Sequence, residues 1–479
     1  MTPARTKIVA TIGPASRSRD KLARLLDEGV DVFRLNMSHG STEDHGQALE
    51  RLRELADSRG AVFAVMADLC GPKVRTGTID PEDATLAAGA GCMITRESMT
   101  GTAEKFSTNY PGIVDDVSVS DRLLIEDGSI ALRVVEKQPD ALVCKCEVGG
   151  TLGTHKGLNL PDSDLSLPAV TEKDESDLRW AVANSVDYVA QSFVRRPEDL
   201  AALRERLDRA GGGDVPIVAK IETTQAVAAL EEIVEAVDAV LVARGDLGVE
   251  MDVWRVPMVQ KDIVRRCCRL GKPVIVATQM LQSMVANASP TRAEVSDAAN
   301  AILDGADALM LSAESAVGAY PVESVRMLNR IALQVEKDRL ESAADFSRVL
   351  AEGSWVGRQV DRRAAAVARS AVLIAQDLGA KLLVVWCRTG RTVRWISKYQ
   401  IPKALVGLSS DGSLCRRLAL CGGVEPRLVP EDFESGAMPS SRLYEQLTAW
   451  SALVPGDMIV VVGEPTAPHR ASTINIHTV

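Results

Sequence analysis

PIVAKIETTQAVAALEEIVEAVDAVLVARGD, residues 216–246, contains the repeating unit that decides the fold. An apolar run (216–222) is followed by an amphipathic helical pattern and then by a second apolar run (239–246). Nearly continuous apolar strands separated by a helix are typical of parallel strands that are buried on both faces. The two runs end close to Glu222 and Asp246, so a carboxylate is expected at the end of each strand.

The same unit recurs along the chain. Runs rich in Val, Ile, Leu and Ala alternate with helical patterns in most of the intervals. The eight runs cover residues 7–13, 30–36, 61–68, 186–193, 216–222, 239–246, 273–279 and 306–314. Eight such units predict an α/β fold, a closed (β/α)8 TIM barrel. An open doubly wound sheet is the alternative.

The interval between the third and fourth runs is longer than 100 residues and has a different texture. Its short alternating runs, broken by Gly, Asp and Pro, predict an all-β domain that could close over the C-terminal face of the barrel. Strand and helix patterns return near residue 340 and predict a smaller α/β domain with an open sheet. The predicted domains are a barrel (1–72 and 169–339), an inserted β-rich lid domain (73–168) and a C-terminal α/β regulatory domain (340–479).

Composition narrows the class of protein. The 479 residues are 46% apolar and 25% charged, which is typical of a soluble chain of several domains. A formal net charge of −10 argues against nucleic acid as a partner. The sequence suggests neither a membrane span nor a signal peptide, so a cytoplasmic protein is expected. Nine cysteines show no disulfide framework, and the pair Cys144 and Cys146 lies in an alternating strand pattern rather than a metal motif.

Strand ends of a barrel converge, so their polar residues form one candidate site. These residues are Arg34, Asn36, Ser38, Asp68, Lys220, Glu222, Arg244, Asp246, Thr278, Gln279, Ser312 and Glu314. Lys220 lies inside an apolar strand, where an unpaired ammonium is costly. Glu222, two residues later, points to the same strand face. The alternative to a catalytic role is a local ion pair that satisfies itself.

The chemistry of this list favours an anionic phosphorylated substrate. Glu222 and Asp246, with substrate oxygens and water, are a suitable ligand set for Mg²⁺. The "ARGDLG" turn opens a short helix whose free N–H groups favour an anion. Neither a Ser-His-Asp set nor a G-x-x-x-x-G-K-[ST] loop is found.

Several longer motifs closely resemble the pyruvate kinase family. They are "TKIVATIGPAS", "RLNMSHG", "KGLNLP", "AKIE", "ARGDLGVE", "VIVATQMLQSM" and "PTRAEVSDAANAILDGADALMLSAESAVGAYP". The resemblance extends over nearly the whole chain. It implies phosphoryl transfer from phosphoenolpyruvate to ADP, giving pyruvate and ATP. It also implies Mg²⁺, with Mn²⁺ as an alternative, usually K⁺, and a homotetramer.

The resemblance assigns roles to individual positions. The residues implied to bind phosphoenolpyruvate are Arg34, Lys220, Gly245, Asp246 and Thr278. Those implied on the nucleotide side are Asn36, His39, Arg75, Asp127 and Lys156. Glu222 and Asp246 match the Mg²⁺ ligands, and Lys220 matches the lysine that stabilises the phosphoryl group during transfer. Thr278 and Ser312 match hydroxyls that are linked through water to protonation of the enolate, whose donor stays open.

"ADLCGPKVRTG" (67–77) departs from the family pattern at the monovalent-cation site. The family coordinates K⁺ at the positions of Asn36, Ser38 and Asp68. In K⁺-dependent relatives the residue after this aspartate is typically Thr, and the position of Lys73 is occupied by Glu. This chain has Leu69 and Lys73 at these two positions. An ammonium has the same single charge as K⁺, and two such charges in one pocket repel. We therefore expect Lys73 to act as an internal replacement and the enzyme to require Mg²⁺ but not K⁺.

"CRTGRT" (387–392) follows a strand and opens a helix in the C-terminal domain. Backbone N–H groups, hydroxyls and guanidinium groups could bind a phosphorylated effector there. The effector residues are Arg388, Thr389, Gly390, Arg391 and Thr392. An ordinary strand-to-helix turn is the alternative.

Two other functions remain open from the sequence. One is a different enolate enzyme on a related barrel, such as a Mg²⁺-dependent lyase or aldolase. The other is a non-catalytic effector-binding protein that has kept the fold. Lys220 and the predicted lid argue against the first, and the intact charged strand ends argue against the second.

Overall fold

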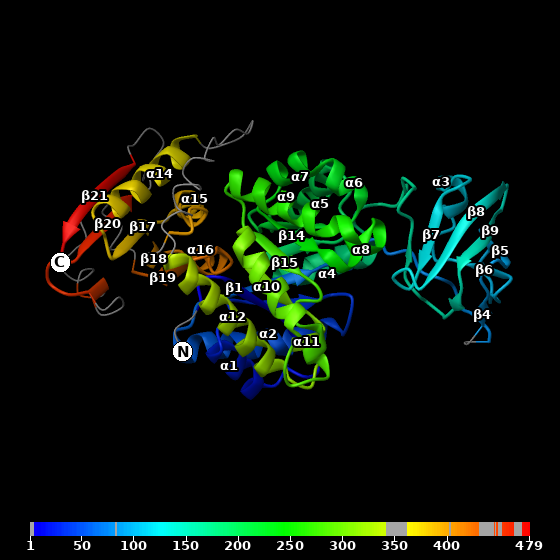
Figure 1. Cartoon of the computed structure of the whole chain (residues 1–479), viewed down its shortest axis with the longest axis horizontal. Helices are drawn as coiled ribbons and strands as arrows, with labels where there is room; N and C mark the ends of the chain where they lie inside the picture. Colours follow the sequence, from blue (N-terminus) through cyan, green and yellow to red (C-terminus); the bar gives the residue numbers. More distant parts are fainter. Residues whose placement is uncertain are drawn as a thin grey trace.

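The structure is a computed structural model that describes residues 4–81, 84–341, 362–401, 404–430, 445, 447–448, 453–463 and 472–479. Three parts follow one another along the long axis (Figure 1). The lid domain lies at one end, the barrel in the middle and the C-terminal domain at the other end. The two ends of the barrel therefore face different domains.

The predicted barrel is confirmed. Its strands are β1 (Lys7–Thr11), β2 (Val32–Asn36), β3 (Ala64–Asp68), β12 (Tyr188–Gln191), β13 (Ile217–Ile221), β14 (Ala239–Ala243), β15 (Val274–Ala277) and β16 (Ala308–Leu311). They close in chain order, with β16 pairing back to β1 in parallel. Each strand lies within one of the eight apolar runs. The open-sheet alternative is wrong.

Helices cover the outside of the strands. They are α1 (Arg19–Asp27), α2 (Thr42–Arg59), α4 (Glu172–Ala183), α5 (Pro197–Arg209), α6 (Thr224–Ala228), α7 (Leu230–Ala236), α8 (Arg244–Glu250), α9 (Val256–Arg269), α10 (Arg292–Asp304), α11 (Ala313–Ala316) and α12 (Pro321–Glu341). Short 3-10 turns, η1 (Val253–Arg255) and η2 (Gln282–Val285), precede α9 and α10. Local sequence starts several helices, because Ser41, Thr171 and Thr291 each form a capping box.

The apolar core explains why this arrangement is stable. One cluster joins the strands to the surrounding helices, and a second fills the barrel interior with residues such as Val9, Met66 and Leu241. Leu420 of the C-terminal domain packs into the second cluster. That domain therefore covers the end of the barrel that lies opposite the C-terminal ends of its strands.

The insertion forms an antiparallel-rich β domain, as predicted. Its main sheet has the order β11 (Leu158–Asn159), β7 (Arg122–Ile125), β8 (Ile130–Gln138), β9 (Ala141–Val148), β5 (Gly91–Thr95) and β6 (Lys105–Ser107). A small pair, β4 (Thr85–Leu86) with β10 (Gly150–Thr151), and one helical turn, α3 (Ile113–Asp116), complete it. Cys144 and Cys146 are buried in β9, as the strand pattern predicts.

The C-terminal domain is an open five-stranded sheet. Its order is β19 (Val424–Leu428), β18 (Ala404–Ser409), β17 (Leu382–Trp386), β20 (Met458–Gly463) and β21 (Thr473–Thr478), the last antiparallel to β20. The described helices are α14 (Arg362–Asp377), α15 (Arg391–Ser397) and α16 (Gly412–Leu418).

The predicted start of this domain at 340 borders residues 342–361, which lie outside the described residues. The proposed domain boundaries stay predictions. Over the described ranges, no helix combines the length and apolarity needed to cross a membrane.

Candidate active site

A charged cluster occupies the C-terminal ends of β2, β3 and β13. Arg34 Nε donates to Asp68 Oδ2 at 2.6 Å, and Lys220 Nζ lies 3.3 Å from Asp68 Oδ1. Lys220 Nζ also lies 2.9 Å from Glu222 Oε1. The Asp68 and Glu222 side chains are only 1% and 2% exposed. The structure therefore brings together, out of bulk water, four residues that sequence reasoning placed in one site.

The ionisation of this cluster follows from its geometry. Burial alone would lower the pKa of Lys220, but Asp68 and Glu222 together raise it above its ordinary value. Burial alone would raise the pKa of Asp68, but Lys220 and Arg34 hold it below its ordinary value. At neutral pH the ammonium and the Asp68 carboxylate are thus both charged. Asp68 Oδ1 lacks a hydrogen bond in the described structure, so the cluster is not saturated.

Glu222 and Asp246 are the two carboxylates that could hold a divalent cation. Burial raises the pKa of Glu222, and the charge of Asp246 raises it further, against the opposing effect of Lys220. A cation placed between two carboxylates would relieve this repulsion. The described residues contain no group of three or more His, Cys, Asp or Glu side chains arranged for a metal. The remaining ligands would therefore have to be substrate oxygens and water.

Gly245 and Thr278 meet at the ends of β14 and β15. The Gly245 N–H donates to Thr278 Oγ1 at 2.7 Å, and Thr278 has a left-handed backbone with a φ of 67°. Arg244 is a structural cation rather than a free one: it lies 2.7 Å from Asp297 Oδ2 and donates to the Thr278 carbonyl at 2.8 Å. These contacts hold an unfavourable turn in place at the strand ends.

Ser312 is connected to the same turn through Glu314. The Ser312 N–H donates to Glu314 Oε2 at 2.8 Å, and the Leu281 N–H donates to Glu314 Oε1 at 3.0 Å. Glu314 is only 1% exposed. This carboxylate therefore joins the loop after β15 to the loop after β16, where sequence reasoning placed the two hydroxyls.

The residues expected on the nucleotide side occupy two separate places. Asn36, the last residue of β2, and His39 lie at the turn after β2, where Asn36 Oδ1 accepts at 3.2 Å from the N–H of Ser38, a residue expected at the monovalent-cation site. The other three, Arg75, Asp127 and Lys156, belong to the lid.

Within the lid these three residues lie near one another in the fold. Arg75 bridges to Gly157 and donates to the His155 carbonyl at 3.1 Å. Lys156 forms an ion pair with Glu126, the residue before Asp127. The lid set and the barrel set therefore belong to two domains that a nucleotide would have to join.

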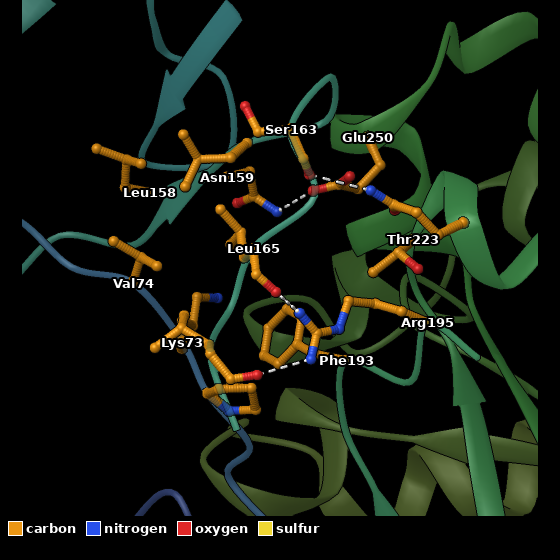
Figure 2. A pocket seen from close by; sticks show the side chains of 14 residues that line it. Lys73, Val74, Leu158, Asn159, Ser163, Leu165, Phe193, Arg195, Thr223 and Glu250 are labelled. Atoms are coloured by element: carbon orange, nitrogen blue, oxygen red, sulfur yellow. Dashed lines mark hydrogen bonds between the residues drawn. The ribbon is translucent and has the colours of Figure 1, made fainter. Parts of the chain in front are cut away.

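Lys73 is not brought to Asp68. Its ammonium lies over the Phe193 ring, 5.7 Å from the centroid, in a crevice between the lid and the barrel. Figure 2 shows Lys73 and Phe193 on one side of this crevice and the hydrogen-bonded Asn159 and Glu250 on the other. Among the described residues, Asp68 pairs with Arg34 and Lys220 instead.

The "CRTGRT" segment forms the predicted strand-to-helix turn between β17 and α15. Gly390 has a φ of 72° and precedes the first residue of the helix. Arg388, Thr389 and Arg391 are exposed, whereas Gly390 and Thr392 are buried. The part of this turn that could touch an effector is therefore smaller than the sequence suggested.

Sequence reasoning missed the contribution of the fourth strand, β12. Ser192 Oγ accepts from Lys220 Nζ at 2.7 Å, and the Phe193 N–H donates to Glu222 Oε2 at 2.7 Å. Both residues follow directly after β12, in the run 186–193. A serine at the end of an apolar strand was the available signal, but it is a weak one because serine is common in turns.

The barrel with this charged end defines a class: TIM-barrel enzymes that act on anionic substrates at their C-terminal strand ends. The chain also matches two family models, "Pyruvate kinase, barrel domain" over residues 3–325 and "Pyruvate kinase, alpha/beta domain" over residues 365–477. The chain belongs to the pyruvate kinase family.

Individual relatives agree with this assignment. A pyruvate kinase of Corynebacterium efficiens is 39% identical over 476 residues, covering 99% of this chain and 97% of the relative. One from Geobacillus stearothermophilus is 41% identical over 428 residues, covering 89% and 72% respectively. A crystal structure of a pyruvate kinase from Cryptosporidium parvum superposes with a TM-score of 0.92 at 33% identity, covering 99% of this chain and 96% of that one.

Proposed function

We propose that this enzyme transfers the phosphoryl group of phosphoenolpyruvate to ADP, forming pyruvate and ATP. The observation behind the proposal is the buried cluster of Arg34, Asp68, Lys220 and Glu222 at the strand ends. Two cations fixed at these strand ends can hold a phosphoryl group and stabilise the charge that develops on its oxygens. A coupled assay for ATP formation tests this reaction. The same assay distinguishes phosphoryl transfer from a lyase or aldolase reaction, which would form no ATP.

Arg34 and Lys220 bind and stabilise the phosphoryl group in this proposal. The Gly245 and Asp246 amides, at the start of α8, and the Thr278 hydroxyl hold the carboxylate of phosphoenolpyruvate, which replaces the hydrogen bond that the Gly245 N–H otherwise donates to Thr278 Oγ1. When the phosphoryl group leaves, the enolate of pyruvate takes up one proton at carbon. Thr278 and Ser312 take part through water, and Glu314 keeps their two loops together.

Mg²⁺, or Mn²⁺ as an alternative, would be held by Glu222 and Asp246. When bound, the metal neutralises charge on the phosphate oxygens. Chelation should abolish ATP formation, and added Mg²⁺ should restore it. Glu222→Gln should weaken Mn²⁺ binding measured by electron paramagnetic resonance, a readout that does not depend on turnover. Unchanged Mn²⁺ affinity would contradict this ligand assignment.

We also propose that the enzyme does not require K⁺. The Leu69 side chain is buried in the core, and its carbonyl accepts a hydrogen bond from Ser192 Oγ at 2.7 Å. The residue after Asp68 therefore offers little to a monovalent cation, and Asp68 already has two cationic partners. Lys73 adds a positive charge in the crevice between the lid and the barrel, and a movement of the lid would have to bring this charge toward Asp68.

Turnover in K⁺-free buffer, with a bulky organic cation maintaining ionic strength, tests this independence. Activity should be nearly the same with and without KCl. The double substitution Leu69→Thr with Lys73→Glu should create a dependence on K⁺. A many-fold rise of wild-type activity on adding KCl would contradict the proposal.

We also propose an effector site in the C-terminal domain, a homotetrameric assembly and a cytoplasmic location. Exposed Arg388 and Arg391 beside the Gly390 turn support a site for a phosphorylated effector.

Three large apolar side chains on the surface support self-association into a homotetramer. Val253, Trp254 and Met258 are 67%, 74% and 63% exposed. A cytoplasmic location fits a glycolytic reaction. Titration with sugar phosphates and AMP, and sedimentation velocity, test the effector site and the oligomer.

A further inference from the structure

The turn after β12 connects three neighbouring strand ends of the active site. β12 pairs in parallel with β3 on one side and with β13 on the other. Ser192, the first residue after β12, is 3% exposed and lies between the strand that ends in Asp68 and the strand that contains Lys220. It is therefore placed where a single side chain can contact both.

The hydrogen bonds of Ser192 have a fixed direction. Its hydroxyl donates its one proton to the Leu69 carbonyl at 2.7 Å. Its oxygen can then only accept, and it accepts from Lys220 Nζ at 2.7 Å. The two carboxylate oxygens near the same ammonium lie farther away, at 2.9 and 3.3 Å. Ser192 thus makes the shortest of these three contacts, and it is the neutral partner.

The next residue completes the arrangement. Phe193 has a left-handed backbone with a φ of 53°, a conformation that is uncommon for a residue other than glycine. In this conformation its N–H donates to Glu222 Oε2 at 2.7 Å. One turn therefore fixes Lys220 through a side chain and Glu222 through the backbone.

We propose that Ser192 is a positioning residue for Lys220. Two carboxylates attract an ammonium strongly but impose little direction on its N–H groups, because the ammonium behaves as a point charge. A neutral acceptor held by the Leu69 carbonyl fixes one N–H and so sets the direction of the others. The N–H that faces Asp68 Oδ1 makes the longest of the three contacts, at 3.3 Å, and is then available to an oxygen of the transferred phosphoryl group. This inference rests on the proposed catalytic role of Lys220.

Ser192→Ala should lower kcat roughly 10- to 100-fold, the scale expected when a reacting group is misplaced by about 1 Å. KM for phosphoenolpyruvate should change by no more than about threefold, since Arg34 remains in place. Ser192→Thr, which keeps the hydroxyl, should recover most of the lost kcat. The matched control is Ser324→Ala on α12, where a fully buried serine donates to the Tyr320 carbonyl at 2.8 Å. It should lower the thermal midpoint similarly but leave kcat unchanged.

The double variant Ser192→Ala with Lys220→Met makes the test decisive. If Ser192 acts through Lys220, the serine substitution should cause no further loss of kcat in the Lys220→Met background. A Ser192→Ala enzyme with nearly full kcat, or losses that multiply in the double variant, would overturn the proposal. If Lys220→Met alone is fully active, the proposed role of Lys220 fails instead, so the two failures are distinguishable.

Discussion

Lys220 of the barrel and Lys398 of the C-terminal domain are both buried, and they lie at opposite ends of the barrel. Lys220 lies among the C-terminal strand ends and Lys398 at the junction with the C-terminal domain. Lys398 Nζ pairs with Asp307 at 2.5 Å, and the two side chains are 2% and 3% exposed. In both cases burial alone would lower the lysine pKa, and the neighbouring carboxylates raise it above its ordinary value.

The two clusters differ in how completely their hydrogen bonds are made. Asp307 also accepts from the Val274 N–H at 2.9 Å and from the Gly422 N–H at 3.0 Å, so both of its oxygens have partners. Asp68, by contrast, leaves Oδ1 without a hydrogen bond in the described structure. A buried ion pair whose partners are complete is a structural contact. One whose acceptor has only an ion-pair contact at 3.3 Å, and which gathers extra charge, has capacity for a ligand.

The largest expected effect is on kcat, when Lys220 is replaced. Lys220→Met should lower kcat by roughly 10³- to 10⁵-fold, the range for a cation removed from a phosphoryl-transfer site. The measurement is ATP formation at saturating phosphoenolpyruvate and ADP. Lys398→Met is the matched control and should retain kcat within a few-fold while it remains folded. Similar losses of kcat in both variants would contradict the distinction between the two lysines.

The second effect is on stability. Lys398→Met leaves the Asp307 charge buried without a cation and should destabilise the protein by about 3 kcal/mol. A raised lysine pKa means that the pair contributes fully below the ordinary lysine pKa of 10.5, and that this contribution is lost as pH rises through the higher folded value. Thermal midpoints should therefore be compared at neutral pH. An unchanged midpoint would show that the junction does not depend on this pair.

Glu250 lines the crevice between the lid and the barrel and should have an effect on stability of intermediate size. It accepts from Asn159 Nδ2 at 2.8 Å, and burial raises its pKa to about 7 from an ordinary 4.5. Since the folded protein holds this proton more tightly, stability should fall between pH 4.5 and 7 and remain lower above that. Glu250→Gln keeps the Asn159 contact and should stabilise the protein by about 2 kcal/mol at pH 8. It should have no effect at pH 4.5, and a pH-independent difference in midpoint would contradict the argument.

The smallest expected effect on stability is that of an exposed ion pair. Arg209 and Glu205 form an exposed ion pair on α5, with side chains 71% and 60% exposed. Arg209→Ala should change stability by less than about 0.5 kcal/mol, because water screens such pairs. A loss as large as that of Lys398→Met would show that burial is not what separates these ion pairs.

Much of the architecture could be predicted from the chain alone. Apolar runs about as long as a strand, alternating with helical patterns, indicated all eight barrel strands, and the change of pattern after residue 72 indicated the β-rich insertion. The period of a strand also placed Lys220 and Glu222 on one face. These features depend on residues close together in sequence, so local patterns were sufficient.

Strand patterns in the sequence indicate which charged residues reach the C-terminal end of the barrel, but the contacts among these residues depend on tertiary packing. Lys398 and Asp307 are 91 residues apart, and no local pattern relates them. The sequence did not indicate the contact of Ser192 with Lys220, and it wrongly suggested that Lys73 would lie beside Asp68. Both outcomes have the same cause: hydrogen bonds depend on separations of a few tenths of an ångström between distant segments. Periodicity gives the face of a strand. Only the packed barrel and its lid set those separations.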